Sequence, residues 1–394
     1  MLSGSEASWR VLVALLVYDG EEHVGPCLAS LAHMKPGSHS SEVLILDDAS
    51  PTPGSSDRCR EMTTDLGFEY YRSPRNLGIP RNKNLAMLHA VEAGYDAVVL
   101  LNADTQVPAN LISTLIRPLI ENPFVSSTTA WSNNSSVYSL PNRDPDHLVQ
   151  VPGLVDWLSE ELDNEFEGQA TTIPSGVGFC MAMPTSAIQD VGVMDPVFDR
   201  GSSMEIDWCQ RSHSMGYRSV LAPACFVYHA GSGIEEAEGS MGDGERIANT
   251  HQAIIDDRYS QYRSQLLTLL SSGTIDGIRE KANGRIIICA AREKGYRLEV
   301  SRLHQNADDH DAVRFRVDPT GGVPAITATY EGFEQSFAVA EDGVLQTVEN
   351  LIGKSPDEIR IFDHGRFAQD LEADAKMLAI DRVLRRTPYR EQVL

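Results

Sequence analysis

The 394-residue chain has no apolar run long enough to cross a membrane, no excess of basic residues and no closely spaced cysteines. A transmembrane helix needs about 18 or more apolar residues, whereas the first apolar run covers only Val11–Tyr18. That run has no basic leader and no small-residue cleavage site, so we interpret it as a strand and not as a signal peptide. Any membrane contact is therefore expected to be peripheral.

The charge balance is acidic, with 33 Lys and Arg residues against 56 Asp and Glu residues and a net charge of −23. A surface of this sign repels the phosphates of nucleic acids and of anionic lipids. We therefore expect no nucleic-acid partner and no strongly basic membrane-docking surface, although a local basic patch is compatible with the balance.

The cysteines are scattered and none forms a C-x-x-C pair; they are Cys27, Cys59, Cys180, Cys209, Cys225 and Cys289. This usage indicates a reducing compartment and no zinc site, which predicts a cytoplasmic location. The length of the chain is sufficient for about two domains.

Strands and helices alternate four times in the first 120 residues. The predicted strands are Val11–Val17, Glu42–Leu46, Phe68–Tyr71 and the stretch Ala97–Asp104. The predicted helices are Glu21–Met34, Ser55–Leu66, Pro80–Ala93 and Pro108 to about Ile120. This alternation predicts a mostly parallel sheet between two layers of helices, connected by right-handed crossovers.

Carboxylates stand at the ends of two of these strands. Asp47 and Asp48 follow one strand, and the apolar run of another ends on Asn102-Ala103-Asp104. The carboxyl ends of parallel strands share one sheet edge, where open α/β sheets bind ligands. An anionic edge repels a phosphorylated ligand unless a Mg²⁺ or Mn²⁺ ion bridges the two. Asp104 is therefore either a metal ligand or a cap for the following helix.

A polar, basic segment, Arg75–Asn84, lies between these acids in the sequence and opens a helix. Free N–H groups at a helix start, together with cations, attract a nucleotide phosphate. The alternative is a solvated loop with a helix cap.

The region from Val125 to Arg200 is less regular, and further strands and helices are predicted after it. Strands are predicted at Ser126–Trp131, Phe179–Met183, Ser219–Leu221 and Phe226–Tyr228, and helices at Leu154–Phe166, Glu205 to about Met215 and Glu245–Leu270. Ser132–Pro152 is interpreted as a long surface loop and Gly231–Gly244 as a mobile segment or domain edge. Glu205 and Asp207 stand two residues apart on a helix and so point in different directions, which predicts different roles.

Four motifs together make the chain similar to the family 2 glycosyltransferases of the GT-A fold, especially the bacterial rhamnosyltransferase-like branch. They are LILDDAS (Leu44–Ser50), RNLGIPRNKN (Arg75–Asn84), LLNADTQVP (Leu100–Pro108) and the block from Gly176 to Gly233 that contains MEIDWCQRSHSMGYRS. Each motif alone is weak, but the four occur in the order and spacing of the family, over more than half of the chain.

The resemblance implies a metal-dependent, inverting transfer of a sugar from a UDP- or dTDP-sugar to a saccharide or lipid-linked saccharide. It places the enzyme in the synthesis of bacterial cell-surface polysaccharide, at the inner face of the membrane. It implies Glu205 as the catalytic base with Asp207 beside it, and Asp104 and His229 as ligands of Mn²⁺ or Mg²⁺. The implied nucleotide contacts are Asp47, Asp48, Asn76, Arg81, Asn84 and Asn102, and the implied acceptor contacts are Trp208 and Gly176. For Glu205 a helix cap or an acceptor ligand remains an alternative, and for His229 a packed or surface residue.

Three positions depart from the family pattern. Asn102 replaces the first acid of the metal motif, Met204 stands where relatives carry an acid before the base, and Lys83 stands where Arg or Asn is common. Asn102 removes one negative charge, so it either weakens metal binding or contacts ribose instead.

A second α+β domain is predicted from Gly284 onwards. Its predicted strands are Arg285–Ala290, Arg297–Leu303, Ala312–Val317, Ala325–Tyr330, Gln335–Val339 and Glu358–Phe362, and its helices Val344–Ile352 and Ala368–Leu378. We expect three parts: a catalytic domain at 1–233, a lid or helical linker at 234–283 and an accessory domain at 284–394. The last is a candidate for homo-oligomerisation, for acceptor binding or for a degenerate half of another sugar-transferase domain.

Two other classes of protein remain open. A nucleotidyltransferase also uses a parallel sheet and a metal-binding carboxylate, but it carries a Gly-rich basic loop after the first strand. Here that place is Asp19-Gly20-Glu21-Glu22, which argues against this class. The second class is a catalytically inactive sugar-binding or assembly protein, which Asn102 and Met204 keep open.

Overall fold

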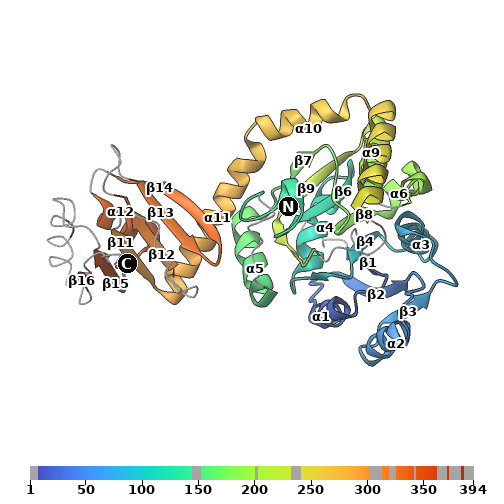
Figure 1. The fold of residues 1–394 in the computed structure, drawn as a ribbon, viewed down its shortest axis with the longest axis horizontal. Coiled ribbons are helices and arrows are strands. Elements are labelled where there is room, and N and C mark those ends of the chain that lie inside the picture. Colours follow the sequence, from blue (N-terminus) through green and yellow to red (C-terminus); the bar gives the residue numbers. More distant parts are fainter. Residues whose placement is uncertain are drawn as a thin grey trace, which may run out of the picture. The chain divides into compact units, whose positions relative to one another are not determined.

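The computed structural model describes residues 8–143, 152–199, 203–231, 241–300, 313–318, 325–340, 343–361, 371 and 383–385. The chain divides between Gly277 and Ile278 into two compact units, each described here by itself (Figure 1). Of the segments expected from the sequence, residues 144–151, 232–240 and most of Ala368–Leu378 lie outside these ranges.

The first unit alternates strands and helices from its start. Its strands are β1 (Arg10–Val17), β2 (Ser40–Asp47), β3 (Glu69–Arg72), β4 (Ala97–Asn102), β5 (Thr105–Gln106), β6 (Val125–Trp131), β7 (Thr171–Ile173), β8 (Cys180–Pro184), β9 (Arg218–Phe226) and β10 (Tyr228–His229). Its helices are α1 (Glu21–Ala32), α2 (Ser55–Asp65), α3 (Ile79–Glu92), α4 (Leu111–Glu121), α5 (Val155–Phe166), α6 (Thr185–Val191), α7 (Ser203–Ser214), α9 (Met241–Arg258) and α10 (Tyr262–Ser271).

Eight of these strands form one sheet in the order β3-β2-β1-β4-β8-β6-β9-β7. Strands β3, β2, β1 and β4 run parallel, as do β6 and β9, whereas β8 is antiparallel to both β4 and β6. The predicted α/β class with a mostly parallel main sheet is therefore confirmed, and β4 lies near the middle of the sheet.

The inner residues of β1, β4 and β8 are apolar because helices cover both faces of the sheet (Figure 1). In β1, Val11, Val13 and Leu15 belong to one hydrophobic cluster, while Leu12 and Ala14 belong to the cluster on the other face. Side chains of a strand alternate between faces, so a strand buried on both sides, such as β1, is apolar at consecutive positions.

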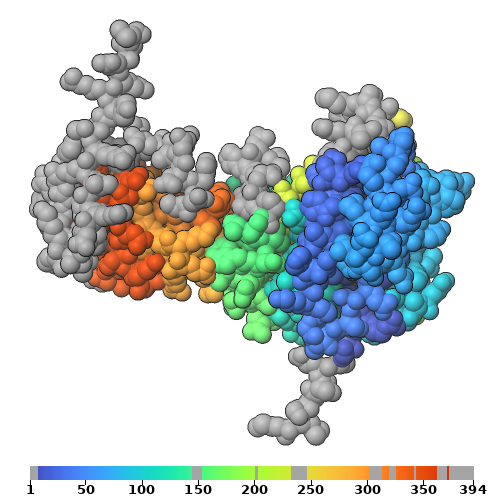
Figure 2. All heavy atoms as spheres, turned by 90° about the horizontal axis from the view of Figure 1, so that it is seen from below, coloured from blue at the N-terminus to red at the C-terminus, as the bar shows by residue number. Residues whose placement is uncertain are grey.

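The acidic strand ends share one edge of the sheet, as predicted. Residue Val17 of β1 pairs with Asp47 of β2, and Leu16 pairs with Asn102 of β4. The strands β2 and β4 therefore end level with each other on either side of β1. In Figure 2 the first elements of the chain, in blue, form a continuous surface of this unit.

The first part of the expected surface loop Ser132–Pro152 is buried, which corrects that prediction. Ser132, Asn133, Tyr138 and Leu140 are each at most 4% exposed. The segment is polar but needs no solvent, because its side chains bond to backbone groups: Asn133 Nδ2 donates to the His229 carbonyl oxygen at 2.9 Å, and Asn133 Oδ1 accepts from the His229 N–H at 2.8 Å.

Two further expectations need correction in unit 1. Residues 218–226 form one strand, β9, rather than two short ones. The long helix expected over Glu245–Leu270 is interrupted between α9 and α10.

No helix in the described ranges combines the length and apolar character that crossing a bilayer requires.

The second unit holds a sheet of order β14-β13-β12-β11-β15-β16. Its strands are β11 (Tyr296–Val300), β12 (Val313–Val317), β13 (Ala325–Tyr330), β14 (Phe333–Ala338), β15 (Glu358–Ile361) and β16 (Val383–Arg385), and it contains α12 (Val344–Ile352) and most of α11 (Thr274–Lys294). Burial alternates along β11 and β12, as in a sheet with one apolar face.

The predicted strand Arg285–Ala290 is wrong, because these residues lie within α11. Its Ile-rich stretch resembles a strand, but Ile286, Ile287, Ala290 and Ala291 are fully buried. This spacing of one and four residues is that of a helix face.

Candidate active site

Asp104 and His229 are brought together by a two-stranded ribbon at the end of β4. The chain turns after Asn102 and enters β5, which pairs antiparallel with β10 so that His229 lies opposite Thr105. The Ala230 N–H donates to the Asp104 carbonyl oxygen at 2.9 Å. As a result, His229 Nε2 lies 3.2 Å from Asp104 Oδ2, although 124 residues separate the two in the sequence.

The His229 ring is held in place from two further sides. Its Nδ1 lies 2.7 Å from the Asn134 carbonyl oxygen, and its ring stacks on Phe179 with centroids 5.3 Å apart. Burial alone would lower the pKa of His229, but the hydrogen bond and the charge of Asp104 outweigh it and raise the pKa. With Nδ1 donating its proton to Asn134, loss of the Nε2 proton that faces Asp104 would leave the Nε2 lone pair available, the arrangement that a metal-binding histidine needs.

These two side chains fit a divalent cation. Two neighbouring ligands about 2.1 Å from one ion lie about 3 Å apart in an octahedral site, close to the 3.2 Å between Asp104 Oδ2 and His229 Nε2. The carboxylate suits Mn²⁺ or Mg²⁺, and the imidazole is a ligand typical of transition metals. Within the described ranges no group of three or more His, Cys, Asp and Glu side chains could hold a metal, so no third side chain of these types completes the pair there.

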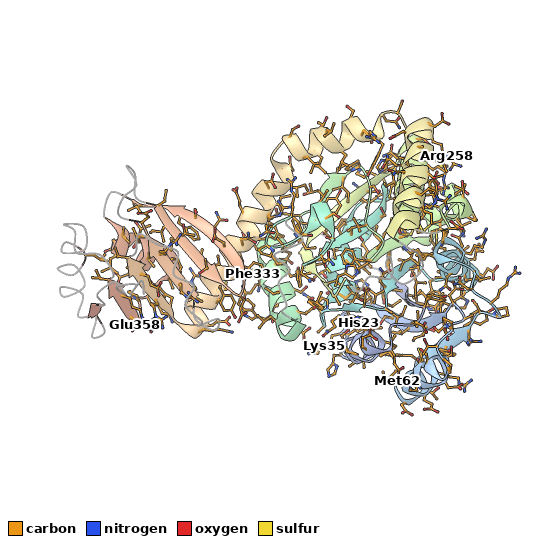
Figure 3. The ribbon with its side chains drawn as sticks, in the orientation of Figure 1. His23, Lys35, Met62, Arg258, Phe333 and Glu358 are labelled. Atoms are coloured by element: carbon orange, nitrogen blue, oxygen red, sulfur yellow. The ribbon has the colours of Figure 1, made fainter. Side chains whose placement is uncertain are left out.

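A cavity of about 290 Å³ opens beside this pair. Its lining residues come from α1, from the turn after β4 and from the ribbon: His23, Pro26, Asp104, Thr105, Gln106, Tyr228 and Ala230. His23, labelled in Figure 3, lies on α1, which packs against β5.

Glu205, the expected base, lies in the first turn of α7 and is 3% exposed. Its Oε1 accepts a hydrogen bond from Nζ of Lys83, which is itself 2% exposed. The same Nζ donates to the Gly178 carbonyl oxygen at 3.2 Å. The expected base is thus one half of a buried ion pair.

Asp207 points away from Glu205, as its spacing predicts, and connects α7 to α9. Its Oδ1 accepts from Arg258 Nη1 at 2.7 Å and from the Tyr259 hydroxyl at 2.8 Å. Its Oδ2 accepts from Arg211 Nε at 2.9 Å. Asp207 is fully buried, and these contacts assign its carboxylate to helix packing. A catalytic part for it stays a prediction.

Asp47 and Asp48, the expected nucleotide contacts, both bind groups of the protein. Asp47 Oδ1 accepts from the Ser50 N–H at 2.8 Å, and Oδ2 accepts from the Tyr70 hydroxyl at 2.6 Å. Burial alone would raise the pKa of the Asp47 carboxyl, but its hydrogen bonds outweigh burial and lower it. Asp48 accepts from the N–H groups of Leu77 at 2.8 Å and Gly78 at 2.9 Å, and so fixes the basic segment before α3.

The other expected nucleotide contacts lie in different surroundings. Asn76 and Arg81 are exposed beside that segment, where Asn76 Oδ1 accepts from the Gly78 N–H at 2.8 Å. Asn84 is buried, and its amide bonds twice to the backbone of Met194, at 2.8 and 2.9 Å. Asn102 is half-buried at the end of β4, next to the turn that carries Asp104.

The two expected acceptor contacts, Trp208 and Gly176, are buried. Trp208 is 0% exposed and its indole N–H donates to the Gly192 carbonyl oxygen at 2.8 Å. A Cβ on Gly176 would lie 2.7 Å from Thr129 Oγ1. Both residues pack the interior, so Trp208 would reach an acceptor only if α7 moved.

The sequence reasoning did not assign three groups that shape this site. Lys83 was noted as a departure from the family pattern, but its pairing with Glu205 was not foreseen. The ring of Phe179 and the carbonyl of Asn134 hold His229. The available signal was the position of Gly178 and Phe179 directly before an apolar strand.

Comparison with known proteins gives one family. Residues 13–192 match the model of glycosyl transferase family 2. A search of curated proteins finds no match.

The similar solved structures are distant. A structure of GalNAc-T7 with UDP, GalNAc and Mn²⁺ is 13% identical, with a TM-score of 0.44 over 57% of this chain and 44% of that chain. The mannosyltransferase PcManGT from Pyrobaculum calidifontis, in complex with GDP-Man and Mn²⁺, is 19% identical, with a TM-score of 0.45 over 73% of this chain and 76% of that chain. A mycobacterial protein is 16% identical, with a TM-score of 0.41 over 64% of this chain and 76% of that chain. The similarity to glycosyl transferase family 2 therefore rests on the family model, which matches residues 13–192 of the 394-residue chain.

Proposed function

We propose that this chain transfers a sugar from a nucleoside diphosphate sugar, a UDP- or dTDP-sugar, to a hydroxyl group of a saccharide or glycoconjugate. The observation that carries the proposal is the convergence of Asp104 and His229 at the carboxyl end of β4, beside a cavity, in a chain whose residues 13–192 match the family 2 model. This is the edge of an α/β sheet at which ligands bind.

On the donor side, Asp104 and His229 would hold Mn²⁺ or Mg²⁺, whose charge stabilises the diphosphate as it leaves. The basic segment that Asp48 fixes supplies Arg81 and the first N–H groups of α3. These groups favour a bound phosphate. Asn102 stands next to this edge and has no charge to add to the metal site.

On the acceptor side, Glu205 takes the proton of the attacking hydroxyl. The acceptor oxygen forms a bond to the anomeric carbon while the bond from that carbon to the diphosphate oxygen breaks. The bonding electron pair leaves with the nucleoside diphosphate. A single displacement of this kind inverts the anomeric centre and needs no carboxylate nucleophile, unlike a retaining glycosidase. Asp207 contributes by holding α7 against α9.

The biological setting is part of the proposal. We propose a free or lipid-linked saccharide acceptor, met at the inner face of a membrane during the synthesis of bacterial cell-surface polysaccharide. Residues 284–394 would then serve in oligomerisation or in acceptor binding.

A thermal-shift screen tests the donor half of the proposal. The probes are UDP-glucose, UDP-galactose, UDP-N-acetylglucosamine, dTDP-rhamnose and GDP-mannose, each with and without Mn²⁺. A ligand that binds only the folded chain raises the melting temperature according to its concentration and affinity. We expect stabilisation by one uracil or thymine nucleotide sugar that depends on Mn²⁺ and is lost in Asp104→Asn.

The matched control is Asp57→Asn, which removes an exposed carboxylate paired with Arg60 on α2. It should respond to nucleotide sugars as the wild type does. The proposal is contradicted if no probe stabilises the wild type, or if Asp104→Asn is stabilised to the same extent.

A further inference from the structure

Three charged or tightly packed groups from separate elements meet around the expected base. Lys83 comes from α3, Gly178 from the segment before β8, and Glu205 from α7. Lys83 Nζ donates to Glu205 Oε1 and, at 3.2 Å, to the Gly178 carbonyl oxygen. Both charged side chains are almost wholly removed from solvent, at 3% and 4% exposure.

Burying this ion pair costs free energy of folding. Taking two charges out of water costs several kcal/mol per ion, and replacing such a pair by apolar residues is often neutral or stabilising. Removing only one partner is strongly destabilising, because the other charge is left uncompensated. A pair kept at the expected position of the base therefore calls for a functional reason.

Gly178 shows that the space around the pair is fully used. A Cβ at residue 178 would lie 1.9 Å from Glu205 Oε1 and 2.4 Å from Lys83 Nζ. Gly178 is not among the residues with positive φ, so its backbone conformation does not require glycine. The requirement comes from the two charged side chains that lie against its Cα.

The ion pair is also tied to the metal-binding pair through one peptide unit. Gly178 contacts Lys83 and Glu205, and the ring of the next residue, Phe179, stacks on His229. Consecutive Cα atoms are only about 3.8 Å apart. The expected base and the expected metal ligands therefore flank the same short segment.

Within the described ranges, the hydrogen bond and the ion pair of the Glu205 carboxylate both end on Oε1. We propose that Lys83 is a positioning residue for the sugar transfer, because it holds Oε1 of an ionised Glu205 so that Oε2 receives the proton of the attacking hydroxyl. This inference rests on the function proposed above. The proton moves from the acceptor hydroxyl to Oε2, and Lys83 keeps its own proton throughout.

The test compares Lys83→Met, Lys83→Arg and the control Lys35→Met. Lys35 is exposed and lies beyond α1 (Figure 3), so its substitution changes one lysine to methionine away from the site. For each protein the rate of nucleoside diphosphate release is measured from pH 5.5 to pH 9 with Mn²⁺. The substrate is the probe of the screen above that the wild type consumes fastest, with water as the acceptor.

Loss of the neighbouring cation makes a carboxylate harder to ionise, by about one pH unit or more. We therefore expect the acid limb of the Lys83→Met profile to move up by about one pH unit or more, with a loss of about tenfold at pH 6 that shrinks towards pH 9. Lys83→Arg keeps the charge and should keep the wild-type limb, as should Lys35→Met. An unshifted limb in Lys83→Met, or an equal loss of rate at every pH, would overturn the proposal.

Unfolding of Lys83→Met, Glu205→Gln and the double variant separates this inference from the proposed function. Each single variant should be less stable than the double variant, because each leaves one buried charge unpaired. A second outcome is that the single variants are less stable than the double variant while the wild type releases no nucleoside diphosphate. That result would overturn the proposed function and the positioning role of Lys83 in it, but it would leave the ion pair standing. Additive effects in the double variant would overturn the ion pair itself.

Discussion

Gly176 and Gly178 stand two residues apart, and both are required by space rather than by backbone conformation. Their neighbours differ in kind. A Cβ on Gly176 would meet Thr129 Oγ1 at 2.7 Å and Met181 at 3.4 Å, both part of the packed interior. The three atoms nearest to a Cβ on Gly178 all belong to the ends of the Glu205 and Lys83 side chains.

Alanine at these two positions should therefore separate stability from activity. Overpacking of a core costs about 1–3 kcal/mol, so we expect Gly176→Ala to lower the free energy of unfolding by that amount. Gly178→Ala can be accommodated by displacing two flexible side-chain ends, and we expect a smaller loss of stability but a loss of turnover of about tenfold or more. Denaturant unfolding and nucleoside diphosphate release measure the two effects. Equal loss of stability in both variants, with turnover kept in Gly178→Ala, contradicts this reading.

At the scale of single residues, the sequence predicted which groups lie at the sheet edge. It did not predict which partners those groups contact. The acidic ends of β2 and β4 were predicted to lie at one sheet edge because the carboxyl ends of parallel strands share an edge. The pairing of Lys83 with Glu205 joins residues 122 positions apart, and no local pattern encodes it. Trp208 was expected to contact the acceptor because of the motif that contains it, but helix periodicity alone does not say which face of α7 is covered.

At the scale of elements, the buried carboxylate of Asp207 on α7 binds α9 through hydrogen bonds. Arg258 Nη1 bonds both Asp207 Oδ1 and Asp195 Oδ2, at 2.7 and 2.8 Å, and its guanidinium lies 5.5 Å from the centroid of the Phe198 ring. Arg258 lies at the end of α9, as Figure 3 shows. Five residues on, Arg263 bonds Asp256 at the same 2.7 Å, but this second pair is largely exposed.

Methionine at the two arginines should show the difference between these pairs. Hydrogen bonds to buried charged groups contribute about 1.5–3 kcal/mol, whereas exposed ion pairs contribute about 0–1 kcal/mol. We expect Arg258→Met to lower the free energy of unfolding by about 2 kcal/mol and Arg263→Met to leave it within about 0.5 kcal/mol. Denaturant unfolding of both variants is the measurement, and equal costs would contradict the part assigned to Asp207.

The end of α7 is attached to β9 by a neutral histidine. The Ser219 N–H donates to His213 Nε2 at 3.0 Å, and burial lowers the pKa of His213 below 6.5. In the window between the depressed native pKa and about pH 6.5, the unfolded chain binds more protons than the folded chain. Stability is therefore lost as the pH falls through that window, by at most about 1.4 kcal/mol per pH unit.

His213→Gln should weaken this pH dependence, because glutamine offers an acceptor oxygen that does not titrate. We expect the loss of unfolding free energy between pH 7.5 and pH 5.5 to be smaller in the variant than in the wild type. His229, whose pKa is raised, acts in the opposite direction and is present in both proteins. An identical pH dependence in the two proteins would rule out a role for His213.

Helices and strands were predicted well where the buried residues follow a regular helix or strand repeat, and poorly where they do not. Helix Val344–Ile352 has the predicted bounds, and its buried residues follow a helical repeat. The stretch Arg285–Ala290 was predicted as a strand because β-branched residues dominate it, but tertiary packing overrides that preference. The segment after Trp131 was predicted as an exposed loop, since a run of Asn and Ser does not reveal that those side chains bond to buried backbone groups.

At the scale of the whole molecule, the division after Gly277 places the named residues of the candidate site in unit 1. Asp104, Lys83, Glu205 and His229 all lie before this boundary, and the buried residues of α11 at 286–291 lie after it. We therefore expect residues 1–277 to fold alone and to show the same Mn²⁺-dependent thermal shift as the full chain. Circular dichroism and the nucleotide-sugar screen check this, and failure of the shorter chain to fold would show that residues 278–394 are needed for the stability of the first unit.

Turnover tests the central claim most directly. Purified full-length chain is incubated with Mn²⁺ and the nucleotide sugar that stabilises it most, and released nucleoside diphosphate is measured beside Glu205→Gln. The account predicts release by the wild type and a loss of at least about a hundredfold in Glu205→Gln, because removal of a general base costs about 10²–10⁴ in rate. Release at the same rate by both proteins would contradict the assignment of Glu205, and no release by the wild type from any nucleotide sugar would contradict the proposed activity.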